Sequence, residues 1–301
     1  MNSIDKLIRL ADVRGTLDLR CQFQGDWTLE HEQEILGKAP YHIVLAGSCR
    51  VELPGGKGLS MRAGDILMLP NGMPHILRNS DQHVAQTSST RITSGPVPVR
   101  HIGNSSPDLD MLCGSFHFNR GSLLLASLPS YVLIPGTAMP DDGSLQALVE
   151  LLRGEADGHQ LGARALLDAL SQALFTLILR AHLHHHGEKN GALALLADKR
   201  MGPVWQAFLA DPAHDWDIGS LAQMAAMSRA TFMRTFVRLA GVSPWTLLTR
   251  IRMELAFSLL SHSHLGLSDI ALQVGYQSQA AFNKKFKETY GKTPGRARRG
   301  I

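Results

Sequence analysis

The stretch that decides the fold is IGSLAQMAAMSRATFMRTFVRLAGVSP (218–244), and its pattern returns fifty residues later in LSDIALQVGYQSQAAFNKKFKETYGKTP (267–294). The shared positions are Phe232, Phe236, Gly241, Ser243 and Pro244 in the first copy, and Phe282, Phe286, Gly291, Thr293 and Pro294 in the second. In each copy a short helical segment precedes a serine, Ser228 or Ser278, that is suited to cap the next helix. This order predicts two successive helix-turn-helix units.

The second helix of each predicted unit has one apolar side and one polar side. Its two phenylalanines stand four residues apart, so they share a face and belong to the core. The opposite side carries Arg229, Ala230, Met233 and Arg234 in the first copy, and Gln279, Ala280, Asn283 and Lys284 in the second. Arg and Lys suit guanine edges, Gln and Asn suit adenine, and Ala can contact a thymine methyl group. A helical bundle with polar outer faces explains a doubled pattern poorly, so these residues are predicted to contact double-stranded DNA.

The segment between the two copies, SPWTLLTRIRMELAFSLLSHS (243–263), predicts one amphipathic helix. Its length could hold the two units about 34 Å apart, so that both enter successive major grooves. Residues 196–301 also carry 14 Lys and Arg against 7 Asp and Glu, whereas the rest of the chain is slightly acidic. A basic C-terminal part is consistent with a nucleic-acid partner.

Residues 200–299, which contain both copies, resemble the DNA-binding domain of the AraC/XylS family of transcriptional regulators. The resemblance implies a sequence-specific regulator, more often an activator than a repressor, and not an enzyme. The expected partners are promoter DNA, RNA polymerase and a second copy of the chain.

The length and composition predict two domains of a cytoplasmic protein. The chain has 301 residues and is 44% hydrophobic, which is enough for two cores. No window reaches the roughly 18 uninterrupted apolar residues of a membrane span, so no membrane partner is expected. Three scattered cysteines do not form the disulfide framework of a secreted domain.

The N-terminal part, between about residues 15 and 135, contains short apolar runs separated by turn residues, which predicts a small all-β domain. Gly64, Asp65, Pro70 and His75 form a G-D-x4-P-x4-H pattern that resembles the cupin barrels. The predicted fold class is therefore α+β, with a cupin-like β-barrel followed by an all-α double helix-turn-helix domain. The residues from 79 to 110 are predicted to form a long loop.

After Pro140 the apolar residues take helical spacing, which predicts two helices bridging the two halves. The expected organisation is a cupin-like sensor domain at 1–139, a helical connector at 140–197 and the DNA-binding domain at 198–301.

Two histidines and two cysteines are the candidate functional residues of the barrel. If His42 and His75 point inward, their imidazoles meet, and Cys21 and Cys113 lie in strands of the same barrel. Two His and two Cys would suit zinc or a softer transition metal. The ordinary alternative for each histidine is a hydrogen-bonded core residue, and for each cysteine a small buried apolar residue. Cys49 is assigned to packing.

The resemblance narrows the role of these residues. Cys21 and Cys113 match positions in a member of this family that responds to reactive chlorine species, in which cysteine oxidation activates the regulator. This implies a redox sensor in which His42 and His75 bind a metal or lower the pKa of a thiol. The alternatives are a regulator that binds a small organic ligand or a metal in the barrel, and a cupin enzyme. The enzyme is disfavoured because the usual H-x-H-x3–4-E cluster is missing.

Overall fold

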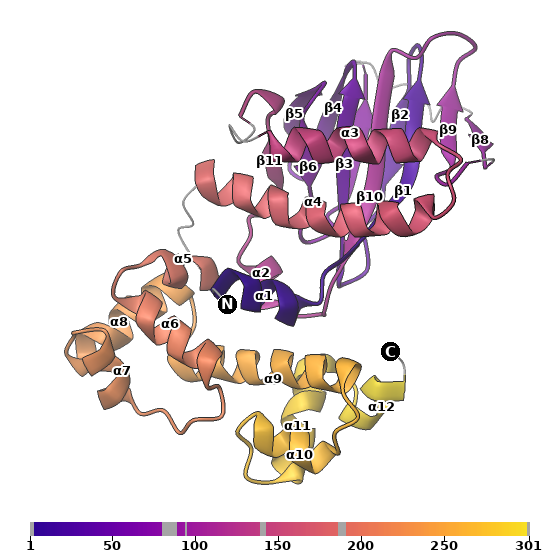
Figure 1. The fold of residues 1–301 in the computed structure, drawn as a ribbon. Coiled ribbons are helices and arrows are strands. Elements are labelled where there is room, and N and C mark those ends of the chain that lie inside the picture. Colours follow the sequence, from indigo (N-terminus) through magenta and orange to yellow (C-terminus); the bar gives the residue numbers. More distant parts are fainter. Residues whose placement is uncertain (1–2, 80–88, 94, 139–142, 186–190, 300–301) are drawn as a thin grey trace. The chain divides into compact units, whose positions relative to one another are not determined.

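A computed structural model describes residues 3–79, 89–93, 95–138, 143–185 and 191–299 (Figure 1). The chain divides into two compact units, each described here by itself. The strand unit comprises Val13–Phe118 and Leu128–His186, and the helical unit comprises Met1–Asp12, Asn119–Ser127 and Gly187–Ile301.

The strand unit is built on two sheets. The larger sheet has the strand order β11-β6-β3-β10-β1-β9-β8, and the smaller has the order β2-β7-β4-β5. The strands are β1 (Arg14–Phe23), β2 (Thr28–His31), β3 (Lys38–Ala46), β4 (Ser48–Leu53), β5 (Lys57–Arg62), β6 (Ile66–Met68), β7 (His75–Arg78), β8 (Thr90–Ile92), β9 (Val99–Ile102), β10 (Leu109–His117) and β11 (Val132–Ile134). Among the described strands no pairing joins the two sheets into one closed barrel. The predicted α+β class is confirmed, but the strands form two sheets and not a barrel.

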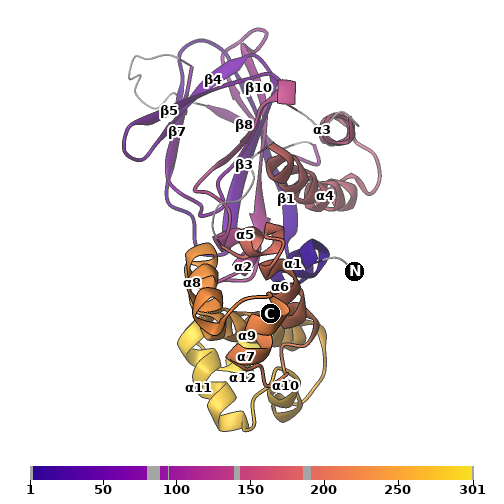
Figure 2. The ribbon, with the colours of Figure 1, turned by 90° about the vertical axis from the view of Figure 1, so that its left-hand side faces the viewer.

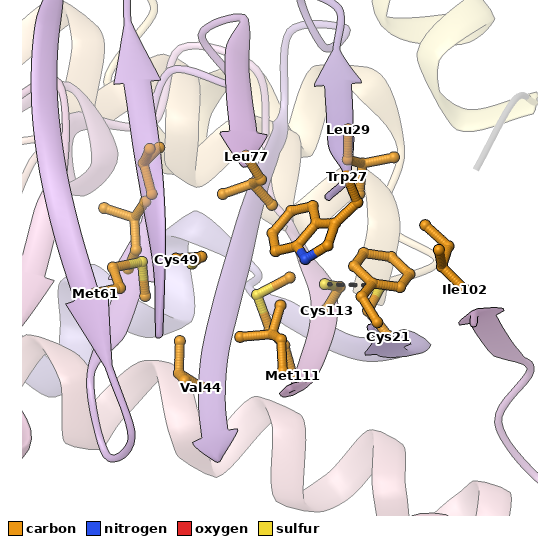
Figure 3. Close-up of a cluster of buried hydrophobic side chains, with 14 of the residues drawn as sticks. Cys21, Trp27, Leu29, Val44, Cys49, Met61, Leu77, Ile102, Met111 and Cys113 are labelled. Atoms are coloured by element: carbon orange, nitrogen blue, oxygen red, sulfur yellow. Dashed lines mark hydrogen bonds between the residues drawn. The ribbon is translucent and has the colours of Figure 1, made fainter. Parts of the chain in front are cut away.

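The core of the strand unit lies on the inward faces of these strands, because alternate side chains of a strand point to the same side of its sheet. The buried cluster contains Phe23 and Val51. Trp27, Leu77 and the three cysteines of the same cluster are shown in Figure 3. Cys49 is buried there, and burial raises the pKa of its thiol to about 12. The cysteines therefore lie inside the apolar core.

Part of the predicted loop at 79–110 is ordered as strands. β8 and β9 lie within it, and β9 pairs in parallel with β1. Residues 80–88 and 94 of the same stretch lie outside the described part of the chain.

Two helices cover the larger sheet. α3 (Ser144–Asp157) and α4 (Ala163–His185) pack against each other, and α4 packs against β1 (Figures 1 and 2). By length and composition α4 could also cross a membrane, and its residues Leu174, Phe175 and Ile178 are buried in the strand unit. The helices expected to bridge the two halves therefore belong to the strand unit.

The helical unit contains the two repeated helix pairs. Its helices are α1 (Ser3–Ala11), α2 (Leu123–Ala126), α5 (Ala192–Ala197), α6 (Met201–Ala210), α7 (Ile218–Met224), α8 (Arg229–Ala240), α9 (Pro244–His262), α10 (Leu267–Gln273), α11 (Gln279–Tyr290) and α12 (Pro294–Arg299). α7 and α8 form the first pair, α10 and α11 the second, and α9 joins them. Gly241 and Gly291 end α8 and α11 in the left-handed conformation, as predicted.

Two segments from the N-terminal half of the chain complete the helical unit. α1 packs against α2, α6 and α9. The backbone N–H of Asn119 donates to the carbonyl oxygen of Ala11 (2.8 Å), and its side-chain amide donates to that of Leu10 (2.9 Å). The helical unit therefore includes residues from the N-terminal half of the chain.

Candidate DNA interface and buried cysteine–histidine site

The second helix of the first pair, α8, begins at a capped end and exposes the predicted face. The hydroxyl of Ser228 accepts a hydrogen bond from the backbone N–H of Thr231 (3.3 Å). Phe232 and Phe236 are fully buried, which fixes the rotation of the helix. On the opposite face Arg229, Ala230 and Arg234 are exposed, and Met233 is half-buried.

The second helix of the second pair, α11, repeats this arrangement. Ser278 accepts from the backbone N–H of Ala281 (3.2 Å), and Phe282 and Phe286 are fully buried. The outward residues are Gln279, Ala280 and Lys284, which are exposed, and Asn283, which is half-buried. Both helices therefore present the same pattern of exposure at equivalent positions.

In the strand unit, four predicted residues form a continuous chain of contacts. The Sγ atoms of Cys21 and Cys113 lie 3.8 Å apart (Figure 3). Cys113 Sγ lies 3.2 Å from His42 Nδ1, and His42 Nε2 lies 2.9 Å from His75 Nε2. Cys21 is linked to the histidines only through Cys113 in these contacts.

One backbone carbonyl sets the direction of the hydrogen bonds along this chain. His75 Nδ1 lies 3.0 Å from the carbonyl oxygen of Met73, which can only accept, so Nδ1 carries the proton. In a neutral His75 the other nitrogen, Nε2, then accepts from His42 Nε2. His42 Nδ1 is therefore left as an acceptor, and it faces the thiol of Cys113.

The electrostatics keep the two histidines and the thiol neutral. Burial lowers the pKa of His42 well below its usual value, and burial also lowers that of His75. The hydrogen bond with Cys21, together with burial, raises the pKa of Cys113 well above its usual value. The raised pKa of Cys113 does not support a role of these histidines in lowering the pKa of that thiol, because a neutral imidazole supplies no positive charge.

A third histidine, His31, joins the site and was not predicted. Its ring stacks on that of His75, with ring centroids 4.4 Å apart, and the two residues are paired across β2 and β7. His31 Nε2 is buried without a hydrogen-bond partner in the described residues, and burial lowers the pKa of His31 to about 3. One nitrogen from each of the three rings lies within 4.8 Å of the others. The sequence feature that could have indicated His31 is its alternation with Leu29, which places both side chains on the same face of a short strand.

A buried ion pair fixes the two strands that carry the cysteines. Arg20, next to Cys21 in β1, donates through Nε and Nη2 to the two carboxylate oxygens of Asp110 in β10, at 2.8 and 2.6 Å. The Arg20 guanidinium also bonds Asp157 at the end of α3. Because the pair is bidentate and buried, it holds β1 and β10 in one register.

The strand unit also has a cavity of about 420 Å³, lined by residues that include Cys49, Met61 and Asp65. Cys21, Cys113, His42 and His75 are not among the residues that line it. A small organic ligand in this cavity would therefore not touch the four predicted residues.

Together, a two-sheet unit with a buried polar cluster and a helical unit with two exposed helix-turn-helix pairs have the architecture of a DNA-binding protein with a second, separate domain. The family described as Cupin matches residues 3–184, and the family described as Helix-turn-helix domain matches residues 221–300. An HTH-type transcriptional regulator of Haemophilus influenzae is 37% identical over 301 residues, which is 100% of this chain and 99% of that protein.

Two further relatives match over nearly the same length. The HTH-type transcriptional regulator MtrA of Neisseria gonorrhoeae is 32% identical, over 99% of this chain and 98% of its own. The RCS-specific HTH-type transcriptional activator RclR of Escherichia coli is 29% identical, over 100% of this chain and 98% of its own. The chain belongs to the AraC/XylS family of HTH-type transcriptional regulators that carry an N-terminal cupin domain.

Proposed function

We propose that this regulator is an activator that responds to oxidants, reactive chlorine species among them, through a disulfide between Cys21 and Cys113. The observation that carries the proposal is the 3.8 Å separation of the two Sγ atoms. The name of the Escherichia coli relative, an RCS-specific activator, supports the same class of signal. Both thiols are buried, which favours a small uncharged oxidant such as hypochlorous acid.

The chemistry balances with one oxidant molecule for each disulfide. Cys113 takes the chlorine of hypochlorous acid, and its own proton leaves with the hydroxide as water. The Cys21 sulfur then displaces chloride and loses its proton, forming the S–S bond. His42 Nδ1, the acceptor within hydrogen-bond distance of Cys113, can take the Cys113 proton during the chlorine transfer and pass it to the hydroxide, and the Cys21 proton leaves together with chloride. Two thiols are thereby oxidised by two electrons, and hypochlorous acid is reduced to chloride and water.

The strand register explains how this bond would act on the fold. Cys21 stands opposite Met111 in β10, so Cys113 is its diagonal neighbour. Diagonal neighbours are about 7–8 Å apart, whereas the Cα atoms of a disulfide are usually about 4.4–6.8 Å apart. Closing the bond therefore requires β1 and β10 to shift against each other.

Thiol trapping and mass spectrometry before and after brief hypochlorous acid treatment test this function. We expect a Cys21–Cys113 disulfide in the oxidised protein, and loss of oxidant-induced transcription in Cys21→Ala and Cys113→Ala. Cys49→Ala is the matched control, because Cys49 is equally buried but lies outside the pair. Normal induction in the Cys21→Ala and Cys113→Ala proteins would exclude the cysteine mechanism.

A second candidate function is a response to a metal ion held by His31, His42 and His75. It is favoured by the close approach of the three rings and by the buried, unpartnered Nε2 of His31. Three imidazoles fit zinc or copper, and neither Cys21 nor Cys113 belongs to this group of candidate ligands among the described residues. The metal would act as the signal by drawing β2, β3 and β7 together.

Metal analysis of the purified, untreated protein separates the two candidates. A metal-responsive regulator should retain one ion for each chain, and His31→Ala should lose it. His117→Ala, which changes an exposed histidine at the end of β10, is the control. Protein free of metal that also fails to take up added zinc or copper(I) would exclude this function.

We further propose that the outward residues of α8 and α11 contact the bases of the operator. Their exposure supports this role, as do the basic side chains of Arg229, Arg234 and Lys284. Four expectations from the sequence stay predictions. They are contact with RNA polymerase, formation of a homodimer, a cytoplasmic location, and the domain boundaries at 139/140 and 197/198.

A further inference from the structure

The connecting helix α9 carries one side chain that holds both helix-turn-helix pairs. Arg252 donates from Nε to the carbonyl oxygen of Pro212 (2.7 Å) and from Nη2 to that of His214 (3.2 Å). Its Nη1 donates to the carbonyl oxygen of Gly275 (3.3 Å). Three donors of one planar group thus bond three backbone carbonyls.

The bonded carbonyls lie where each helix pair is positioned. Pro212 and His214 belong to the loop that leads into Asp217, the N-cap of α7 in the first pair. Gly275 lies in the turn between α10 and α11 of the second pair. The guanidinium therefore ties the entrance of one helix-turn-helix to the turn of the other.

The packing around Gly275 is a second sign that the two helix-turn-helix pairs lie close together at Arg252; we call this contact the joint. Its φ of +85° is in the left-handed region, which favours glycine. A Cβ at this position would lie 2.8 Å from the Cα of Ala213 and 2.9 Å from Cζ of Arg252. The loop of the first pair and the turn of the second thus approach each other more closely than any side chain at residue 275 would allow.

The chemistry of the joint requires arginine. The guanidinium offers five N–H donors in a rigid plane, so it can bond several fixed carbonyls at once. A lysine carries its charge on one nitrogen and could not span the same three acceptors. The side chain is also half-buried, so water competes less for these bonds.

We infer that Arg252 is a positioning residue that sets the spacing between the two recognition helices, and hence the distance between half-sites that the protein accepts in DNA. One base pair moves a half-site by about 3.4 Å and rotates it by roughly a tenth of a turn. If Arg252 fixes α8 relative to α11, the protein binds DNA with one spacer length between the half-sites more tightly than DNA with a longer or shorter spacer. The inference rests on the proposed contact of both helices with DNA.

The first experiment checks that contact. Full-length protein is used to select duplexes from a pool with a random region longer than two helical turns. Selection of two conserved half-sites establishes that both helix pairs read DNA, whereas a single half-site would refute the two-groove arrangement and this inference with it. The selected half-sites are then held constant while the spacer is shortened or lengthened by one base pair.

We expect the wild-type protein to discriminate about tenfold against either altered spacer, an effect comparable to one mismatched base pair. Arg252→Gln and Gly275→Ala, which disturb the joint from opposite sides, should reduce this ratio to about threefold or less. The preferred bases within each half-site should stay as in the wild type. Arg250→Gln, an exposed arginine of α9, and Gly295→Ala, where a Cβ meets no atom within 4 Å, are the matched controls.

A folding role alone predicts a different result. If Arg252→Gln weakens binding to all spacers by one common factor, or leaves the spacer profile unchanged, Arg252 does not set the spacing. Should that variant fail to fold, Arg252→Lys keeps the charge and most of the side chain but not the planar fork, and it is measured in the same way. A wild-type spacer profile in both Arg252→Lys and Gly275→Ala would overturn the inference.

Discussion

Glu254 of α9 allows a quantitative prediction about how the stability of the protein depends on pH. Its side chain is 2% exposed and accepts a hydrogen bond from the backbone N–H of Leu123, the first residue of α2, at 3.3 Å. The second carboxylate oxygen is buried and has no partner among the described residues. Burial raises the pKa of Glu254 from 4.5 to about 7. The folded protein thus holds this proton far more tightly than the unfolded chain does.

The sign and size of the effect follow from that difference. Below about pH 4.5 the carboxyl group is protonated in both states, and its contribution to stability is fully present. Between about pH 4.5 and pH 7 only the unfolded state ionises, so the free energy of unfolding falls as the pH rises. At about 1.4 kcal/mol for each pKa unit, the rise to about 7 corresponds to roughly 3 kcal/mol.

Urea unfolding of the full chain at about pH 5 and about pH 8 measures this loss. Glu254→Gln replaces the acid with a neutral group of the same shape, so the comparison removes the contribution of other groups that titrate in this range. We expect the wild type to lose about 2–3 kcal/mol more than Glu254→Gln between the two pH values, because part of the loss has already occurred at about pH 5. Glu288→Gln, an exposed acid paired with Lys285, should behave as the wild type. Parallel losses in the wild type and Glu254→Gln would refute the reasoning.

Three further predictions concern the cores and the DNA contact. Phe286→Ala should lower the free energy of unfolding by about 3–5 kcal/mol, because it empties a fully buried position; a loss below about 1 kcal/mol in urea unfolding would contradict this. Arg20→Met should cost about 3–5 kcal/mol by leaving Asp110 buried without its partner, and the double variant Arg20→Met/Asp110→Leu should recover most of that loss in the same assay. Arg234→Ala should cost about 1–3 kcal/mol of DNA affinity and relax the preference at one base pair, whereas an equal loss on all sequences would assign Arg234 to the phosphate backbone.

The helix-turn-helix half could be predicted in detail because its signals are local. Ser228, Ser278, Gly241 and Gly291 mark helix ends by their own hydrogen-bonding and backbone preferences, which do not depend on distant residues. The phenylalanine pairs fix which face of each helix is buried. The outward residues follow from that choice without any knowledge of the tertiary structure.

The strand half could be predicted only in part because its geometry depends on pairing between distant segments. To predict that His42, His75 and Cys113 lie close together, one must know the register of the three strands that carry them. The cupin resemblance supplied only the approximate order of these strands. His31 reaches the site through the pairing of β2 with β7, which no local pattern specifies. The same limit applies to α1 and α2, whose short sequences do not show that they pack with the C-terminal helices.

The connectivity of these two segments gives the proposed redox function a direct route to the DNA-binding half. β1, which carries Cys21, follows α1 in the chain, and β10, which carries Cys113, leads into α2. Arg14 pairs with His117, so both strands leave the sheet at the same end, and the hydrogen bonds of Asn119 then tie α1 to the start of α2. If the proposed disulfide shifts β1 against β10, we expect the shift to act on α1 and α2, which continue these strands in the chain and belong to the helical unit. The signal need not pass through the helices at 144–186 that we expected to bridge the two halves.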